Sequence, residues 1–263
     1  MKKMSYLLMT PLAVALFVGG AGGACSSGGA RADPLVSSVT GFVSDTVTGV
    51  VGPWYSNADS IGPMASPTNG TDFADSPCGK GGFTMDQCSN VVSPVGGQPF
   101  APTDMKSSKM CTNGTAAKAI NGPDGTPDYG AIWGGEIALD FNNRGGDAGA
   151  RGDFDLSPFQ GIEFDFSGDL IPNNAMAVNF PFTGEYGTSP PSWMGATSET
   201  SPLTVGHNII KWADVGGPLY LAPTVPPPFD KTHVQTINFW VGTDAASTTP
   251  YSFCVANLAL IPN

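Results

Sequence analysis

Hydrophobic and polar residues alternate with a period of two in several segments of this chain. Successive side chains of a β-strand point to opposite faces of a sheet, so each segment predicts a strand with one buried and one solvated face. The segments are Ile137–Phe141, Ile162–Phe166, Met176–Phe182, Ile209–Trp212, Ile237–Val241 and Phe253–Ile261. In the last one, Phe253, Val255, Leu258 and Leu260 can all face inward only if the strand contains an irregularity.

No amphipathic helix pattern separates these segments, which favours antiparallel sheets. The 35 glycines and 24 prolines supply the turns between strands. We therefore predict an all-β fold, an antiparallel β-sandwich, over residues 51–263. The preceding residues, 25–50, are mostly small and polar and predict a flexible tether.

The N-terminus has the order of a bacterial export signal. A basic start at residues 1–3 is followed by an apolar run, Leu7–Val18, and by small residues up to Cys25. The run is too short for a transmembrane helix, so residues 1–24 predict a signal peptide. The cysteine after Gly23-Ala24 resembles the lipobox of bacterial lipoproteins, although Gly22 stands where an aliphatic residue is usual.

This resemblance implies that a lipid is attached to Cys25 and that the membrane is a partner through that anchor. The protein is then exported and held in the cell envelope, and Ser26 after the cysteine implies the outer membrane. The alternative is an ordinary secretory signal that leaves a soluble protein. The net charge of −11 repels phosphate backbones, so we expect no nucleic-acid partner.

Four cysteines follow the anchor: Cys78, Cys88, Cys111 and Cys254. An even number in an exported protein predicts two disulfides, with three pairings possible. Spacing favours Cys78 with Cys88, which leaves Cys111 for Cys254. A zinc site is the rival interpretation, but neither histidine lies near a cysteine in the sequence.

The chain also resembles a known family, on residues spread over about 200 positions. They are Trp54-Tyr55, Cys111–Ala116, Tyr129–Gly135, Phe154–Phe164 and Phe253–Leu258. Together they resemble the galactose-binding-like jelly roll of carbohydrate-binding modules and of surface lipoproteins built on that module. The resemblance implies that the first glycine-bearing strand lies near the last strand, where a Cys111–Cys254 disulfide would join the two ends.

A structural calcium ion is possible in that family. Its closing strand commonly has Asp where this chain has Ala256, which removes one expected ligand. Acidic residues in Gly-rich loops could supply ligands instead, or only keep the turns soluble. They are Asp147, Asp153 and Asp155, together with Asp124 and Asp128.

Trp240 is the leading candidate for ligand binding. Its neighbours Ile237, Phe239 and Val241 alternate into the core, so Trp240 and Asn238 face the other way. An exposed indole stacks on sugar rings while amides and acids bond the hydroxyls. Further candidates, at the outward-facing positions of other alternating segments or in loops, are Glu163, Asp165, Asn179, Trp193 and Trp133. For each tryptophan the alternative is a place in the core.

We predict a non-catalytic carbohydrate-binding protein. A structural or protein-interaction envelope protein without a sugar site is the first alternative. A glycoside hydrolase is the second, because Glu163 and Asp165 share one strand face about 7 Å apart. The sequence contains no nucleophile elbow, HExxH or P-loop motif.

Overall fold

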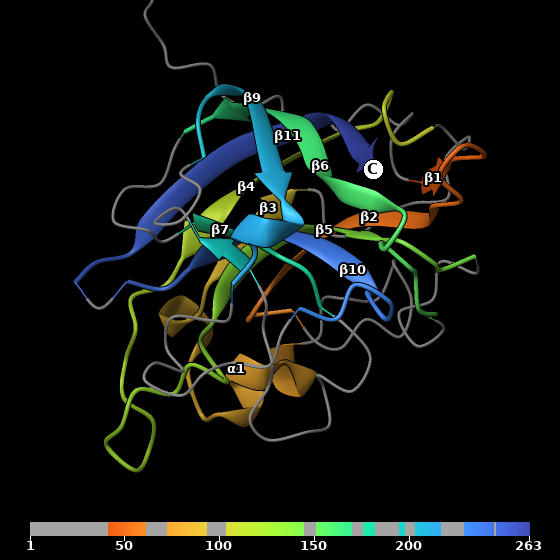
Figure 1. Ribbon diagram of the computed structural model, residues 1–263. Coiled ribbons are helices and arrows are strands. Elements are labelled where there is room, and N and C mark those ends of the chain that lie inside the picture. Colours follow the sequence, from red (N-terminus) through yellow and green to blue (C-terminus); the bar gives the residue numbers. More distant parts are fainter. Residues whose placement is uncertain are drawn as a thin grey trace, which may run out of the picture.

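The structure is a computed structural model, and it describes nine segments of the chain. These are residues 42–61, 73–93, 104–144, 151–169, 176–181, 195–197, 203–216, 229–244 and 246–263. They form two antiparallel sheets that pack face to face (Figure 1). The predicted antiparallel β-sandwich is therefore confirmed.

Six strands form one sheet and five form the other. The first sheet has the order β1 (Phe42–Ser44), β2 (Val51–Ala58), β5 (Gly134–Asp140), β10 (Thr236–Gly242), β7 (Met176–Asn179), β8 (Gly195–Thr197). The second has the order β3 (Asn90–Ser93), β4 (Lys109–Ala116), β11 (Thr249–Pro262), β6 (Phe159–Gly168), β9 (Gly206–Lys211).

The core lies between the sheets and is built from the apolar phase of the alternating strands. Phe239 of β10 lies at its centre and is fully buried. Its ring is 5.0 Å from that of Phe164 in an edge-to-face arrangement, and 6.4 Å from that of Trp54. Such aromatic pairs contribute about 0.5 to 1.5 kcal/mol beyond area burial. The Phe164 pair joins the two sheets, whereas Trp54 and Phe239 belong to the same sheet.

The irregularity predicted in the last strand is present. Pairing of β11 with β6 shifts register between Ala256 and Ala259. Asn257 lies at the shift with φ of 53°, a left-handed conformation that asparagine tolerates better than most residues. The extra residue keeps Leu258 and Leu260 buried on the same side as Val255.

Both predicted disulfides form. Cys111 and Cys254 face each other across β4 and β11 and are bonded. Cys78 and Cys88 close a short segment beside the sandwich. That segment, residues 73–89, is called the disulfide lobe below.

Short helical turns make up most of the disulfide lobe, and α1 lies apart from the strand layers in Figure 1. The turns are η1 (Phe73–Asp75), α1 (Pro77–Lys80) and η2 (Met85–Gln87); a further turn outside the lobe, η5 (Trp212–Asp214), follows β9. Ser76 caps α1 by accepting a hydrogen bond from the Gly79 amide, while proline occupies the first helical position.

The sandwich begins before residue 51, earlier than the sequence predicted. Strand β1 pairs with β2, and Val43 and Val50 are completely buried. The predicted signal peptide and Cys25 lie outside the described residues. In the described part, no helix has the length and apolar character needed to span a membrane.

Candidate functional site

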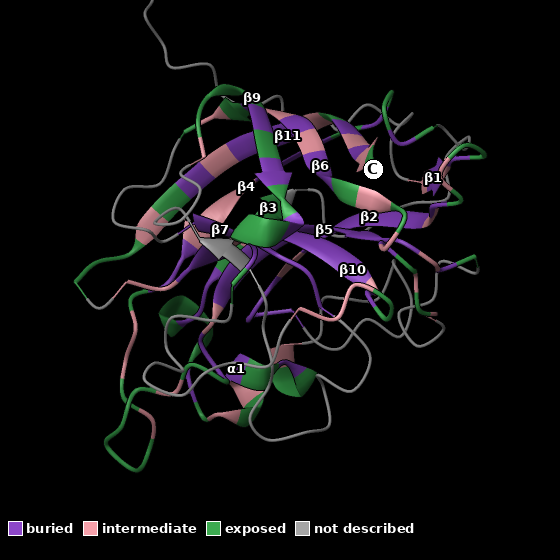
Figure 2. Cartoon of the chain, viewed as in Figure 1, coloured by how far each residue is buried: buried purple, intermediate pink, exposed green. Residues whose placement is uncertain are grey.

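The two sheets differ in their outer faces, the faces that point away from the core. On the six-stranded sheet this face carries Tyr55, Glu136, Asp140, Asn179, Asn238 and Trp240, here called the polar face. All of these except Trp240 are buried. Figure 2 shows β2, β5 and β10 buried along most of their length, whereas burial alternates along β9 and β11. The prediction of a solvated outer face on β10 is therefore wrong.

Glu136 and Asn238 form the centre of the polar face. The Asn238 side-chain amide donates to Glu136 Oε2 at 2.8 Å, and only 2% of Asn238 is exposed. Burial raises the pKa of Glu136 from its ordinary value of 4.5 to about 7, although the Arg151 charge and the Asn238 bond lower it. The Asn238 Oδ1 atom is buried and has no hydrogen-bond partner among the residues that the structure describes.

A second carboxylate, Asp140, anchors the other end of the polar face. It forms a salt bridge with Arg151, with 2.9 Å between Nε and Oδ1. The Thr236 hydroxyl donates to it at 3.1 Å and the Asn143 side-chain amide at 2.7 Å. The Arg151 guanidinium also lies over the Tyr55 ring, 5.4 Å from its centre. The Arg151 charge is therefore already balanced within the protein.

Trp240 is the one residue of β10 that is not fully buried. It lies directly across from Glu136 on β5 and from Ala177 on β7. Its indole N–H donates to the Trp133 carbonyl at 2.9 Å. Trp133 is itself half-buried, beside the end of the polar face. Trp193 lies outside the described residues.

The structure does not bring Glu163 and Asp165 to Trp240. Both lie on β6, in the other sheet, on an outer face that we call the exposed face. Their expected place in one face with Trp240, Asn238 and Asn179 is therefore wrong. Alternation gives the phase of a side chain within its strand but does not show to which sheet the strand belongs.

The exposed face has its own polar cluster. His207 of β9 lies between the two acids, with Nε2 3.7 Å from Glu163 and Nδ1 3.3 Å from Asp165. Asn257, at the irregularity of β11, donates to Asp165 Oδ2 at 2.6 Å. That bond is the main cause of a lowered pKa at Asp165, followed by the contact with His207. A general acid for glycoside hydrolysis needs the opposite shift.

The acidic residues considered for calcium are dispersed. Asp153 and Asp155 are exposed, and both contribute to the raised pKa of His233, whose main cause is its contact with Asp230. Asp124 accepts bonds from its own turn, and Asp128 from Ala131; Asp147 lies outside the described residues. A calcium site at these residues stays a prediction.

Within the described segments, one group of His, Cys, Asp and Glu side chains is close enough to share an ion. It consists of Asp59, Cys78 and Cys88. Both cysteines are joined in the disulfide, so their sulfurs are not thiolates able to bind a metal.

Sequence reasoning missed four members of this site: Glu136, Asp140, Arg151 and Tyr55. A signal for the first two was present, because they occupy the phase opposite Ile137 and Leu139 in a strand whose other residues are Gly and Ala. Two acids among small residues indicate a face that other segments approach closely. Arg151 carried no such signal, since it lies outside the alternating strands.

Comparison with known proteins gives only distant similarity. No family model matches the chain, and no curated protein matches its sequence significantly. Among solved structures, the family 11 carbohydrate-binding module of cellulosomal cellulase Lic26A-Cel5E of Clostridium thermocellum is similar at 15% identity and TM-score 0.35. The match covers 66% of this chain and 81% of that one.

Two further structures are similar at the same level. A family 11 module from Clostridium thermocellum in complex with a β-1,3-1,4-mixed-linked tetrasaccharide gives 15% identity, TM-score 0.33 and coverage of 66% and 81%. A family 30 module of cellulosomal cellulase Cel9D-Cel44B from that organism gives 14%, 0.33, and coverage of 68% and 86%. Scores this low do not transfer ligand chemistry, and the sandwich assignment rests on the strand pairing above.

Proposed function

We propose that the polar face binds a carbohydrate without catalysis, with the sugar ring stacked on Trp240. The observation that carries this proposal is the Asn238 Oδ1 atom, a buried acceptor that no described residue pairs with, on the same face as a partly exposed indole. A buried polar atom left unpaired costs about 1 to 3 kcal/mol. A sugar hydroxyl that reached this atom, once the groups covering Asn238 had moved aside, would recover that free energy while the ring contacts the indole.

Charge favours a neutral sugar over an acidic one. Glu136 and Asp140 are the acids of the polar face, and Arg151 is already paired with Asp140. The undescribed segments between residues 42 and 263 contain no lysine or arginine. A uronic or sulfated sugar would therefore meet carboxylates with no free cation supplied by those segments.

The test is a glycan array with the full chain, purified with both disulfides intact, followed by affinity measurements. Trp240→Ala should lower the affinity for a neutral glycan at least roughly tenfold, about 1.4 kcal/mol. It should cost less stability than the roughly 3 to 5 kcal/mol typical of a fully buried tryptophan, such as Trp54.

Asp165→Asn, on the exposed face, is the matched control and should leave the affinity unchanged. Absence of binding to every glycan by the parent protein contradicts the proposal. So does an equal loss of affinity in the Trp240 and Asp165 variants.

A structural role without a ligand is the second candidate, and the extent of burial favours it. Asn179, Asn238, Asp140 and Glu136 are each at most 8% exposed, as expected for a network that fixes the sheet. In that case Trp240→Ala would lower stability strongly while no glycan bound at all. The hydrolase alternative loses support, because the pKa of Asp165 is lowered and the exposed face is open to water.

We also propose that the protein is anchored in the cell envelope by a lipid on Cys25, and that its sandwich is a galactose-binding-like jelly roll. Both proposals rest on the sequence. Cys25→Ala should release the protein from the membrane fraction or leave it unprocessed. Unchanged membrane partition, with no lipid mass on the mature N-terminus of the parent, contradicts the anchor. Fractionation of the two membranes tests the expected outer-membrane location.

A further inference from the structure

Asp59 is a completely buried acid that the sequence did not single out. It follows β2 directly, and its carboxylate accepts three backbone N–H groups. Oδ1 accepts from Ser89 at 2.7 Å, and Oδ2 from Trp133 at 3.1 Å and from Gly134 at 3.0 Å. Burial raises the pKa of Asp59 to about 6, with these hydrogen bonds acting against the increase.

The peptide group between Trp133 and Gly134 connects Asp59 to Trp240. Its N–H donates to Asp59 Oδ2, and its C=O accepts the indole N–H of Trp240 at 2.9 Å. A peptide group is planar, so rotating it would break both hydrogen bonds at once. One carboxylate therefore fixes the acceptor that orients the Trp240 ring.

Gly134 makes this restraint necessary. Its φ is 120°, a conformation that other residues rarely adopt, and a Cβ there would lie 1.9 Å from the Val241 carbonyl oxygen. Glycine permits the close approach to β10 but leaves the preceding peptide free to rotate. The bonds to Asp59 remove that freedom.

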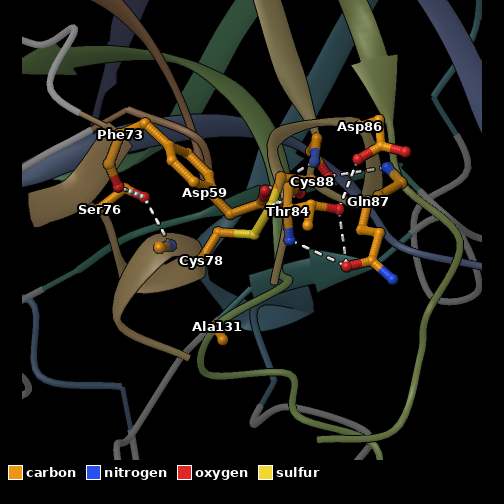
Figure 3. Close-up of a disulfide and its surroundings, with 12 residues drawn as sticks. Asp59, Phe73, Ser76, Cys78, Thr84, Asp86, Gln87, Cys88 and Ala131 are labelled. Carbon is orange, nitrogen blue, oxygen red and sulfur yellow. Dashed lines mark hydrogen bonds between the residues drawn. A yellow bond between two sulfur atoms is a disulfide. The ribbon is translucent and has the colours of Figure 1, made fainter. Parts of the chain in front are cut away.

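Asp59 also binds the disulfide lobe, as Figure 3 shows. Its carbonyl accepts the Cys78 amide at 3.3 Å, and its carboxylate accepts the amide of Ser89, next to Cys88. Hydrogen bonds thus connect the disulfide lobe, Asp59 and the Trp133–Gly134 peptide, which in turn accepts the indole N–H of Trp240.

We propose that Asp59 is the positioning residue for Trp240, holding the Trp133–Gly134 peptide that orients the indole and tying it to the disulfide lobe. The proposal rests on the proposed function only for its effect on glycan affinity. The orientation of Trp240 itself can be measured without any ligand.

The experiment follows the indole N–H of Trp240 by NMR in the full chain, assigned by its loss in Trp240→Phe. Asp59→Asn should shift this signal and raise its exchange rate with water at least tenfold, while the Trp54 and Trp212 indole signals keep theirs. An amide offers one acceptor oxygen in place of two, so it cannot hold all three N–H groups.

Asp45→Asn is the matched control. Asp45 is also buried, and it accepts the backbone N–H groups of Val47, Thr48 and Met105 near β1. Its replacement should leave the Trp240 signal and exchange unchanged. An unchanged Trp240 signal in folded Asp59→Asn, or an equal change in Asp45→Asn, overturns the proposal.

A second variant covers the case in which Asp59→Asn does not fold. Replacing both Cys78 and Cys88 by serine leaves Asp59 in place but loosens the lobe. This variant should also raise the exchange rate of the Trp240 indole N–H with water. No change in that rate overturns the proposal. If the parent binds a glycan, Asp59→Asn should weaken it at least tenfold and Asp45→Asn should not. If the parent binds no glycan, the proposed carbohydrate-binding function is wrong, and the NMR result still tests whether Asp59 positions Trp240.

Discussion

The polar face and the exposed face each hold an acid that accepts a hydrogen bond from an asparagine, with opposite consequences. On the polar face Asn238 donates to Glu136 at 2.8 Å, and the pKa of Glu136 is raised to about 7 because the pair is buried. On the exposed face Asn257 donates to Asp165 at 2.6 Å, and the pKa of Asp165 is lowered.

The difference shows that the hydrogen bond does not decide the state of the acid; access to water does. Water solvates the Asp165 charge, so the asparagine adds to an already favourable ionised form. Burial removes hydration from the Glu136 charge, and one amide and the Arg151 charge offset only part of the cost. Buried acids of this kind mark candidate sites, and exposed ones usually do not.

The largest expected effect is a difference between the two disulfides in how much stability is lost when each is removed. Replacing Cys111 and Cys254 by serine opens a loop of sequence separation 143, for which the chain-entropy model gives up to about 4 to 5 kcal/mol. Replacing Cys78 and Cys88, with separation 10, should cost about 2 to 3 kcal/mol. Guanidinium unfolding of the two double variants measures both values; a larger loss for the second pair contradicts this order.

The next effect compares the two asparagines. Asn238→Ala should lower the free energy of unfolding by about 2 to 3 kcal/mol, because it leaves the buried Glu136 carboxyl without its donor. Asn257→Gly, which preserves the positive φ, should change stability by less than about 0.5 kcal/mol. Urea unfolding at pH 7 provides the comparison, and similar losses in both variants would show that the faces are equally solvated.

The smallest effect is the pH-dependent change in stability when one acid on each face is replaced by its amide, and it has opposite signs on the two faces. The folded state raises the pKa of Glu136, so ionising this acid opposes folding, and the stability of the parent falls as pH rises from 4.5 to about 7. Glu136→Gln cannot ionise, so it should be nearly as stable as the parent at pH 4.5 and should gain stability relative to the parent as the pH rises to 8.

Asp165→Asn provides the control for this pH dependence. The folded state lowers the pKa of Asp165, so its ionised form stabilises the protein above the ordinary value of 3.8. The variant should lose under about 0.5 kcal/mol at neutral pH, because the acid is exposed and screened, and the difference should vanish in acid. A stabilising Asp165→Asn, or a pH-independent Glu136→Gln, contradicts the assignment of the faces.

Much of the fold followed from local pattern. Period-two alternation predicted β6, β10 and β11, because the phase of a side chain depends only on its own strand. The irregularity in β11 followed from the same argument, since Leu258 is out of phase with Val255. Both disulfides followed from the number and spacing of the cysteines together with the family resemblance.

The candidate site could be predicted only in part. Trp240, Asn238 and Asn179 lie on one face as expected, because their strands are neighbours and their phases agree. Glu163 and Asp165 have the same polar phase on their own strand, yet they belong to the other sheet. Phase is a property of one strand, whereas sheet membership depends on pairing between segments far apart in the chain.

The sequence by itself determined which side chains of each strand share a face, and which cysteines were available to pair. The tertiary structure decided which outer face water reaches. Glu136 and Asp165 both alternate with apolar neighbours, but Arg151 and Trp133 lie at the face of Glu136, while His207 and Asn257 leave Asp165 in contact with solvent. Hydration of a charge depends on every segment around it, and no local pattern contains that information.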